Sequence, residues 1–336
     1  TGQPKGVLVE HRGLVNLLDE QISAFAIDGN TRSLFYLSTN FDASISDFGT
    51  ALVAGATLYI EQPADLTPGK ALFDLIKARG ITYVDIPPSA LRLMDPELLP
   101  DCLKSMVIGG EVCPRDVVTA SAKKLRLICV YGPTEATVCT SWTHCLSDLW
   151  QAPLIGKPIN GIKYIVVDAH GKPVDAGTAG ELYISGSGLA RGYLNNPSLT
   201  NERFVTINGE RYYLSRDTVV ETADGNYEFL GRVDRQLKLR GLLIEPEEIE
   251  KHLAEHKQSA RAAVLKRSMP DNPERHVLVA FVQASNSEQK RPDSIELREH
   301  LTKSLPRWML PQRYQWIESM PETTSGKVDV KALGQI

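Results

Sequence analysis

Hydrophobic residues in the first part of the chain alternate between helical spacing and short continuous runs. Leu14, Leu18 and Ile22 recur at helical spacing within residues 12–25. Further helices are predicted at residues 46–53, 71–79 and 114–125. The apolar runs between them are typical of buried strands and lie at residues 33–37, 56–60, 81–86, 105–108 and 125–130. Because strands separated by helices of this length pair in parallel, an α/β arrangement is predicted to about residue 150.

The pattern then changes to short strands separated by Gly and Asp. Strands are predicted at residues 163–167, 181–185 and 211–214. Asp224-Gly225 separates two more apolar segments, residues 219–221 and 227–230, and predicts a hairpin turn because Gly tolerates positive φ. We therefore expect a β-rich subdomain at about residues 151–233.

A boundary is expected at residues 231–234, which separate a large domain (residues 1–233) from a small domain (residues 234–336). Polar and apolar residues alternate at 236–240 as in a half-exposed strand, and Pro246 opens a predicted helix at 246–256. The remaining predicted elements are strands at 262–266, 277–282 and 313–317 and a helix at 295–305. The small domain is thus predicted to be α+β.

Composition narrows the class of protein. The chain has 336 residues, 37 Lys and Arg against 41 Asp and Glu, and a net charge of -4, so a broad basic surface for nucleic acid is not expected. Its apolar stretches at 52–60 and 277–282 are shorter than the roughly 20 residues of a membrane helix. The five cysteines lack CxxC spacing. We expect reduced thiols and a cytoplasmic location, with neither nucleic acid nor membrane as partner.

Two segments have residue types suited to a nucleotide. Residues 1–6 (TGQPKG) combine small residues with Lys, as in loops that bind phosphate. The alternative is that this composition belongs to a mobile N-terminus. Residues 131–135 (YGPTE) follow a predicted strand, where open α/β sheets bind ligands. There Tyr131 could stack on a purine, Thr134 bond a phosphate and Glu135 hold Mg²⁺. The alternative for this segment is a Gly-Pro turn with a helix-cap Thr.

Eight segments, taken in order, resemble core motifs of adenylation domains of non-ribosomal peptide synthetases. These domains belong to the adenylate-forming superfamily, together with acyl-CoA synthetases and luciferases. The segments are residues 1–6, 41–44, 131–135, 180–194, 213–217, 231–250, 305–311 and 325–329. The resemblance implies an α/β large domain with a β-rich subdomain and a small, mobile α+β C-terminal domain. It also implies a further N-terminal stretch, without which we expect no turnover.

The resemblance implies roles for individual residues. Lys327 would be the catalytic lysine, Asp217 would bind the ribose hydroxyls beside Arg232, and Asp234 would be the hinge between the domains. Glu135 would bind Mg²⁺. The implied nucleotide-binding positions are Thr1, Gly2, Lys5, Gly110, Glu111, Tyr131, Gly132, Thr134, Asp217, Phe229 and Arg232.

The implied substrate is an α-amino acid, because Asp42 matches the family Asp that pairs with the α-ammonium group. The implied pocket is Asp42, Ala43, Ser46, Asp85, Val107, Gly109, Val130, Val138 and Cys139, with Lys327 as a tenth position. A second carboxylate, Asp85, is costly to bury against an apolar side chain. We hypothesise a basic, arginine-like substrate. The alternative is that Asp85 caps the turn at residues 87–94.

The implied activity makes an aminoacyl adenylate from ATP and an amino acid, then loads a carrier protein. The small domain would move between the two half-reactions, and residues 236–241 would help to shape the access path for a phosphopantetheine thiol of a peptidyl carrier protein within a larger synthetase. The chain departs from the family at Ser215-Arg216, where Thr-Gly is usual. Two rival hypotheses remain: an acyl-CoA or aryl-acid ligase, and a non-catalytic binding module.

Overall fold

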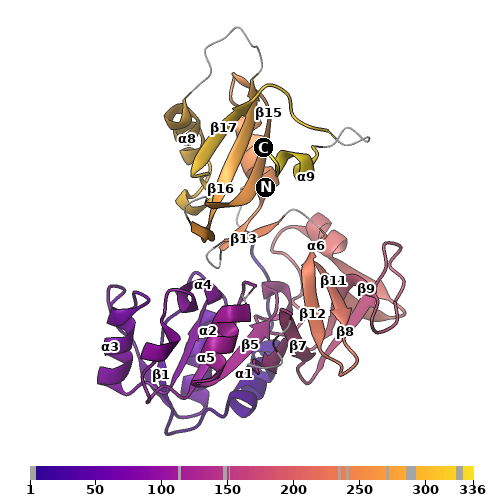
Figure 1. The fold of residues 1–336 in the computed structure, drawn as a ribbon. Coiled ribbons are helices and arrows are strands. Elements are labelled where there is room, and N and C mark those ends of the chain that lie inside the picture. The colour runs from indigo at the N-terminus through magenta and orange to yellow at the C-terminus, as the bar shows by residue number, and fades with distance from the viewer. Residues whose placement is uncertain are drawn as a thin grey trace. The chain divides into compact units, whose positions relative to one another are not determined.

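The computed structural model describes residues 5–112, 115–146, 150, 152–233, 236–239, 242–269, 272–284, 293–322 and 328–336. Two compact units divide the chain (Figure 1). The large unit is Lys5–Val233 and the small unit is formed by Asp234–Ile336. Each unit is described separately below.

Five parallel strands form the first half of the large unit's sheet, in the order β2-β1-β3-β4-β5. They are β1 (Arg32–Leu34), β2 (Thr57–Tyr59), β3 (Tyr83–Ile86), β4 (Ser105–Gly109) and β5 (Arg126–Tyr131). The helices in this part are α1 (His11–Phe25), α2 (Ser44–Val53), α3 (Lys70–Arg79), α4 (Pro88–Leu91), η1 (Pro96–Leu98) and α5 (Arg115–Ala122). The predicted α/β alternation is confirmed.

Helices cover both faces of these parallel strands. Ile76 of α3 and Val118 of α5 are buried with Ile108 on one face. Phe25 of α1 is buried with Val107 on the other. Successive strand residues point to opposite faces, so each face of the sheet has its own core. The alternate positions of β3 and β4 that include Tyr83 and Val107 face α1.

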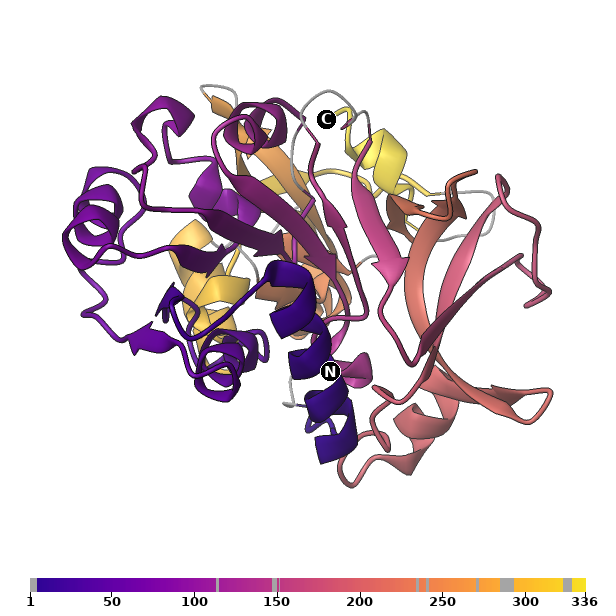
Figure 2. The same ribbon diagram turned by 90° about the horizontal axis from the view of Figure 1, so that it is seen from below.

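The β-rich part continues the same hydrogen-bonded sheet. Its strands follow the order β6-β7-β12-β11-β9-β8, and β6 pairs antiparallel with β5. The elements are η2 (Thr134–Ala136), β6 (Ser141–His144), β7 (Leu154–Pro158), β8 (Ile162–Val167), β9 (Ala179–Gly186), α6 (Pro197–Arg203), β10 (Phe204–Ile207), β11 (Glu210–Glu221) and β12 (Tyr227–Arg232). In Figure 2, α1 lies between the parallel strands and this β-rich part, and Leu17 of α1 is buried in the core of the latter.

The hairpin predicted at Asp224-Gly225 is confirmed. Strands β11 and β12 pair antiparallel, Gly225 has φ +77°, and Asp224 Oδ1 accepts a hydrogen bond from the Thr222 hydroxyl at 2.6 Å. The prediction of separate strands at 211–214 and 219–221 is wrong, because both belong to the twelve-residue strand β11. The polar residues 215–217 interrupt the apolar pattern within this strand.

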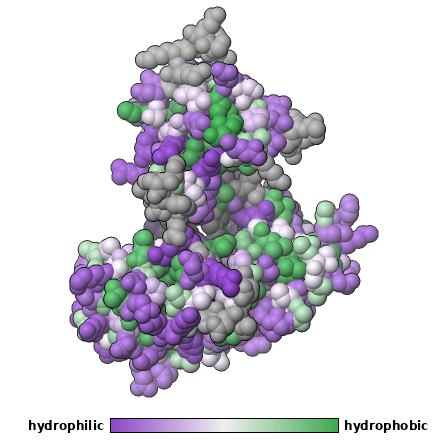
Figure 3. Space-filling view, viewed as in Figure 1, coloured by the Kyte–Doolittle hydropathy of each residue, from purple (hydrophilic) through white to green (hydrophobic). Residues whose placement is uncertain are grey.

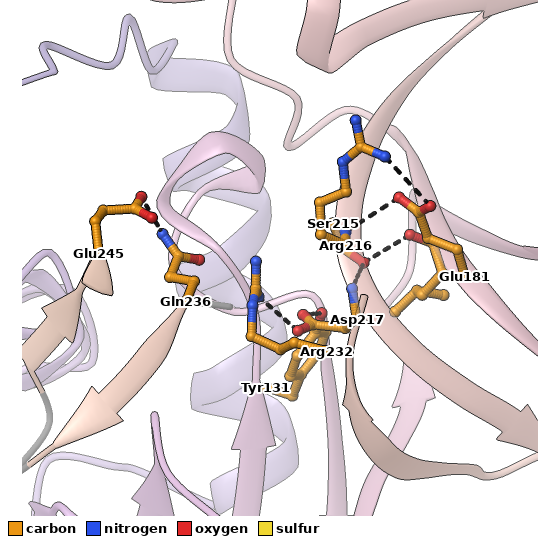
Figure 4. A network of polar contacts seen from close by, with 9 residues as sticks. Tyr131, Glu181, Ser215, Arg216, Asp217, Arg232, Gln236 and Glu245 are labelled. Carbon is orange, nitrogen blue, oxygen red and sulfur yellow. Dashed lines mark hydrogen bonds and ion pairs between the residues drawn. The ribbon is translucent and has the colours of Figure 1, made fainter. Parts of the chain in front are cut away.

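The small unit is α+β, as predicted. Its elements are β13 (Leu237–Leu239), β14 (Leu242–Ile244), α7 (Pro246–Ala254), β15 (Ser259–Met269), β16 (Asn272–Ala284), α8 (Ser294–Thr302), η3 (Arg307–Met309), β17 (Arg313–Ile317) and α9 (Val330–Leu333). Strand β16 pairs antiparallel with β15 and parallel with β17. Asp293 and Glu296 form a capping box that starts α8. Gln236 donates to Glu245 at 2.7 Å beside the β13-β14 pair (Figure 4).

Among the described residues, no helix combines the length and apolar character needed to cross a bilayer. Hydrophilic residues cover much of the face in Figure 3, and hydrophobic residues form smaller groups between them.

Candidate active site

The predicted site residues of the large unit gather at one edge of its sheet. Asp42 follows β1, Asp85 lies near the end of β3, and Gly110 and Glu111 follow β4. The segment at residues 131–135 begins at the end of β5. Because these strands are parallel, their carboxyl ends share one edge, which is where open α/β sheets bind ligands.

Asp217 is the centre of a buried polar cluster (Figure 4). Its Oδ2 accepts a hydrogen bond from the Tyr131 hydroxyl, and its Oδ1 lies 2.6 Å from Nη1 of Arg232. The side chains of Asp217 and Arg232 are 9% and 15% exposed. Burial and the Asp217 charge raise the pKa of Tyr131 well above its usual value, so the phenol stays a donor. The predicted proximity of Arg232 to Asp217 is thus observed.

Two aromatic rings belong to the predicted nucleotide site. Tyr131 and Phe229 both pack, half-buried, against the same hydrophobic core of the β-rich part. Phe229 lies on β12, where its backbone N–H bonds to the Pro153 carbonyl at 2.9 Å. Aromatic faces next to a carboxylate form a surface suited to a nucleoside, with the ring for the base and the carboxylate for hydroxyl groups.

Gly132 is required by close contact with a strained segment. A Cβ at this position would lie 2.4 Å from the Val138 carbonyl oxygen and 2.6 Å from the Cys139 Cα. Thr137 and Val138 have φ of 61° and 66°, which β-branched residues rarely adopt. Such strain often marks a ligand-binding position. The hydroxyl of Thr137 donates to the Gly188 carbonyl at 2.6 Å, which helps to hold this conformation.

Glu135 contacts Tyr193, a residue whose backbone pairs with the start of the described chain. Its Oε1 accepts a hydrogen bond from the Tyr193 hydroxyl at 2.5 Å. Val7 forms a β-bridge with Tyr193, and the Leu194 N–H bonds to the Gly6 carbonyl. Lys5 immediately precedes these paired residues in the sequence. Mg²⁺ is usually bound by one or two carboxylates together with substrate phosphates. Glu135, held by Tyr193 at the sheet edge, fits that role.

The predicted substrate pocket lies on the α1 side of the sheet. Asp85 pairs with Val107 across β3 and β4, and Gly109 pairs with Val130 across β4 and β5. A Cβ at Gly109 would lie 2.5 Å from Cγ2 of Val130, so the absence of a side chain there lets the strands' side chains pack.

The other predicted pocket positions lie just before α2, on α2 and on the segment after η2. Ser46 and Cys139 are buried, and Asp42 and Ala43 are half-buried. Burial raises the pKa of the Cys139 thiol to about 12, so it is neutral, and it donates to the Ser141 carbonyl at 3.3 Å. In the described part of the chain, the carboxylate of Asp42 has no hydrogen-bond or ion-pair partner.

A second buried acid was missed by the sequence analysis. Asp47 of α2 has 0% exposure, and its Oδ2 accepts hydrogen bonds from the backbone N–H groups of Tyr36 and Leu37 at 3.1 and 3.0 Å. Its Oδ1 has no hydrogen-bond partner among the described residues. Position 47 is one turn beyond Ala43 on the same helix face, which could have indicated that it points to the pocket.

The two buried acids influence each other. Burial, and then the charge of Asp47, raise the pKa of Asp85 well above its usual range. Burial raises the pKa of Asp47 to about 7. The alternative that Asp85 caps residues 87–94 is wrong for the described residues: the N–H of Ser89, in α4, bonds instead to Oε2 of Glu111 at 3.0 Å.

Comparison with known proteins identifies the family. Residues 1–194 match the family described as AMP-binding enzyme, and residues 248–327 match its C-terminal domain. The chain belongs to the AMP-binding enzyme family. The resemblance to an adenylation domain of a non-ribosomal peptide synthetase, and the predicted fold class, are confirmed.

Similar proteins include synthetases and a solved adenylation domain. The chain is 41% identical over 337 residues to a linear gramicidin synthase of Brevibacillus parabrevis, covering 99% of this chain and 4% of that protein. It is 37% identical to novobiocin biosynthesis protein H of Streptomyces niveus, covering 98% of this chain and 54% of that protein. The Vibrio cholerae adenylation domain AlmE, in complex with glycyl-adenosine-5'-phosphate, has a similar structure with a TM-score of 0.87 at 25% identity. The match covers 100% of this chain and 64% of the AlmE chain. The chain thus spans about half the length of the novobiocin protein and only 4% of the length of the gramicidin synthase.

Four predicted site residues of this adenylation domain lie outside the described residues. They are Thr1, Gly2, Asp234 and Lys327. The nucleotide positions Tyr131, Asp217 and Arg232 are brought together by the fold, and Phe229 packs against the same hydrophobic core as Tyr131. Glu111 instead contacts α4 through Ser89.

The adenylation domain should show pH-dependent stability because of Asp47. Its folded-state pKa of about 7 lies above the unfolded value of 3.8, so its favourable contribution is complete below pH 3.8 and is lost as pH rises through 7. Asp47→Asn lacks this titration. The melting temperature of the variant relative to wild type should therefore increase from pH 5 to pH 8, corresponding to about 2–3 kcal/mol. A difference that is the same at both pH values would contradict this burial effect.

Proposed function

We propose that this adenylation domain activates an α-amino acid and then loads a carrier protein. In the first step a carboxylate oxygen of the amino acid attacks the α-phosphorus of ATP, an O–P bond forms, and pyrophosphate leaves with the electrons of the broken P–O bond. In the second step a phosphopantetheine thiolate attacks the carbonyl carbon of the aminoacyl-AMP, a thioester forms and AMP leaves.

The observation that carries the proposal is the cluster of Asp217, Arg232 and Tyr131. A buried carboxylate beside an aromatic ring, at the ligand-binding edge of an α/β sheet, can accept hydrogen bonds from two vicinal ribose hydroxyls while the ring packs on adenine. The similar AlmE domain is described in complex with an aminoacyl nucleotide. This likeness supports the same ligand class here.

Phosphate and metal contacts are assigned to the neighbouring segment. Thr134 would bond a phosphate oxygen, and Gly132 would let the backbone approach the nucleotide. Glu135 would hold Mg²⁺ together with the ATP phosphates, where the cation neutralises phosphate charge. Lys5, Thr1 and Gly2 would complete the loop around the pyrophosphate end, and Gly110 and Glu111 would line the nucleotide site.

The small domain supplies the remaining catalytic group in this proposal. Lys327 would bind the substrate carboxylate and the α-phosphate, where negative charge builds during in-line attack. Asp234 would be the hinge that exchanges this arrangement for one in which residues 236–241 shape the path of the thiol. The domain boundary at residues 233–234 supports this division, since the chain separates into compact units there.

The carrier protein is proposed from the nature of the relatives. A similar structure, 27% identical with a TM-score of 0.84, is described as a synthetase protein with adenylation and carrier domains. The partners proposed for this chain are therefore a peptidyl carrier protein and neighbouring synthetase domains.

The substrate is proposed to be an α-amino acid with a basic, arginine-like side chain. Asp42 would pair with the α-ammonium group. Two buried acids, Asp47 and Asp85, both have raised pKa values, so ionising them is costly unless a cation is nearby. A guanidinium group would provide that cation and several donors.

Comparison of arginine with citrulline tests the side-chain assignment, because the two differ in charge and hardly in shape. Wild type should prefer arginine in kcat/KM. Asp85→Asn should reduce that preference by roughly 100-fold, since breaking a buried charge pair costs about 2–5 kcal/mol. Asp101→Asn, which changes an exposed aspartate of the same unit, should leave the preference intact. A wild-type preference for leucine or valine would refute a basic substrate.

Amino-acid-dependent exchange of pyrophosphate into ATP tests the proposed reaction. The whole protein that contains this chain should exchange pyrophosphate with one or a few amino acids and form the matching hydroxamate. Hydroxamate formation with fatty or benzoic acids alone would favour an acyl-CoA or aryl-acid ligase. Neither exchange nor ATP binding in calorimetry would favour a non-catalytic binding module.

A further inference from the structure

Strand β11 contains an irregular segment directly before the proposed ribose-binding carboxylate. Its pairing with β9 is regular up to Leu214, which lies opposite Tyr183, and resumes where Thr218 lies opposite Glu181. Between these pairs β11 has three residues and β9 has one. The additional residues form a bulge, and a bulge redirects side chains relative to a regular strand.

The backbone of this bulge is strained at Arg216. Arg216 has φ +63°, in the left-handed region that costs a residue with a Cβ roughly 1–2 kcal/mol and that glycine adopts readily. The family usually has glycine here, and the sequence analysis identified Arg216 as a departure. The conformation must therefore be held by other contacts in this chain.

One carboxylate contacts both ends of Arg216. Glu181 Oε1 accepts a hydrogen bond from the Arg216 backbone N–H at 3.2 Å, and Oε2 lies 3.7 Å from Nη1 of its guanidinium. The side chains of Glu181 and Arg216 are 13% and 30% exposed. Figure 4 shows Arg216 extending toward Glu181, while Asp217 extends toward Arg232 and Tyr131. A single side chain on β9 thus holds both the backbone and the side chain of the strained residue.

A second contact connects the bulge with Asp217. The Asp217 N–H donates to Ser215 Oγ at 3.0 Å, and that hydroxyl donates to the Leu182 carbonyl of β9 at 2.6 Å. Residues 215 and 216 are therefore both attached to β9, at Leu182 and Glu181. These contacts fix the backbone that carries the Asp217 carboxylate.

We propose that Glu181 is a positioning residue for the nucleotide site, because it holds Arg216 in the left-handed conformation that directs Asp217 to the ribose. The proposal rests on the function proposed above, in which Asp217 binds ribose. It gives Arg216 a defined role: its ion pair with Glu181 stabilises the left-handed conformation that glycine would adopt at this position without such a contact. The two residues should then be energetically coupled in nucleotide binding.

A double-mutant cycle in the whole protein tests this coupling through the KM for ATP in pyrophosphate exchange. Glu181→Ala should raise that KM about tenfold, the effect of losing roughly 1.4 kcal/mol of positioning. Adding Arg216→Gly should bring the KM back to within about threefold of wild type, because glycine adopts positive φ without the carboxylate. Glu202→Ala, an exposed glutamate 58% accessible, is the matched control and should leave the KM unaltered.

The outcomes separate positioning from simple stabilisation. A structural role alone would lower the melting temperature of Glu181→Ala without changing the KM for ATP, or would show no rescue by Arg216→Gly; either result overturns the proposal. If Glu181→Ala does not fold, Glu181→Gln is used, which removes the ion pair and should give a smaller KM increase that Arg216→Gly again reverses. Absence of exchange in wild type would overturn the proposed function and this inference together, whereas wild-type exchange with an unchanged KM in both Glu181 variants overturns this inference alone.

Discussion

Asp217→Ala should reduce kcat/KM for ATP by about 10²- to 10⁴-fold in pyrophosphate exchange. The variant would lose the acceptor for two ribose hydroxyls, and hydrogen bonds to a charged group contribute about 1.5–3 kcal/mol each. It would also leave the guanidinium of Arg232, only 15% exposed, without the carboxylate 2.6 Å away. Steady-state exchange kinetics at varied ATP measures this effect.

The matched control for this prediction is Asp101→Ala. Asp101 is an exposed aspartate in the same unit, and the contacts described for Asp217 are with Tyr131, Ser215 and Arg232. Its kinetics should equal those of wild type. If Asp217→Ala retains kcat/KM for ATP within threefold of wild type, the ribose assignment is wrong.

Gly132→Ala should produce the largest change in stability. The new Cβ would lie 2.4–2.8 Å from the backbone of Val138, Cys139 and Thr140, so the backbone itself must move. Overpacking of this kind costs about 3 kcal/mol, which lowers the melting temperature of a unit this size by roughly 6–12 °C. Movement of residues 138–140 also displaces Tyr131, whose carbonyl bonds to Thr140 N at 2.8 Å, and exchange activity should fall at least tenfold.

Gly29→Ala serves as the control for a glycine in the same unit without close backbone contact. A Cβ there would lie 3.6 Å from the Gly55 carbonyl, an ordinary contact, and its melting temperature should change by no more than about 2 °C. Equal melting temperatures for the two variants would show that the segment after η2 adapts freely. The close packing at Gly132 would then not be the reason why this position has a residue without a side chain.

Much of the fold could be predicted because local pattern and tertiary structure agree. The helix predicted at residues 12–25 corresponds to α1, and the strand predicted at 313–317 corresponds to β17. Each has a regular apolar period and clear boundary residues. The β11-β12 hairpin was predicted for the same reason, since Asp224-Gly225 provides the turn conformation that the strands require.

Other features depend on contacts between distant residues. Strand β11 continues through residues 215–217 although its pairing with β9 stops at Leu214 and resumes at Thr218, and no local apolar pattern indicates this continuation. Asp47 reads as an ordinary polar residue of an amphipathic helix until its carboxylate is seen to bond the backbone of Tyr36 and Leu37. The pairing of Glu181 with Arg216 joins residues 35 positions apart in sequence.

The nucleotide site and the substrate pocket could be predicted from the sequence to different extents. The resemblance to the family indicated Asp217, Arg232 and Tyr131, and the fold brings them into one cluster. Asp85 was identified as a buried acid, but Asp47, whose charge raises the pKa of Asp85, was not, because its burial depends on tertiary packing. Lys327 and Asp234 stay predictions from the resemblance.

A structure of the whole protein with ATP and its preferred amino acid would test the central claim most directly. Both ribose hydroxyls should lie within hydrogen-bond distance of the Asp217 carboxylate, adenine should contact Tyr131, and the Lys327 ammonium should lie beside the α-phosphate. A nucleotide bound away from Asp217, or Lys327 on a surface that cannot reach that nucleotide, would contradict the account.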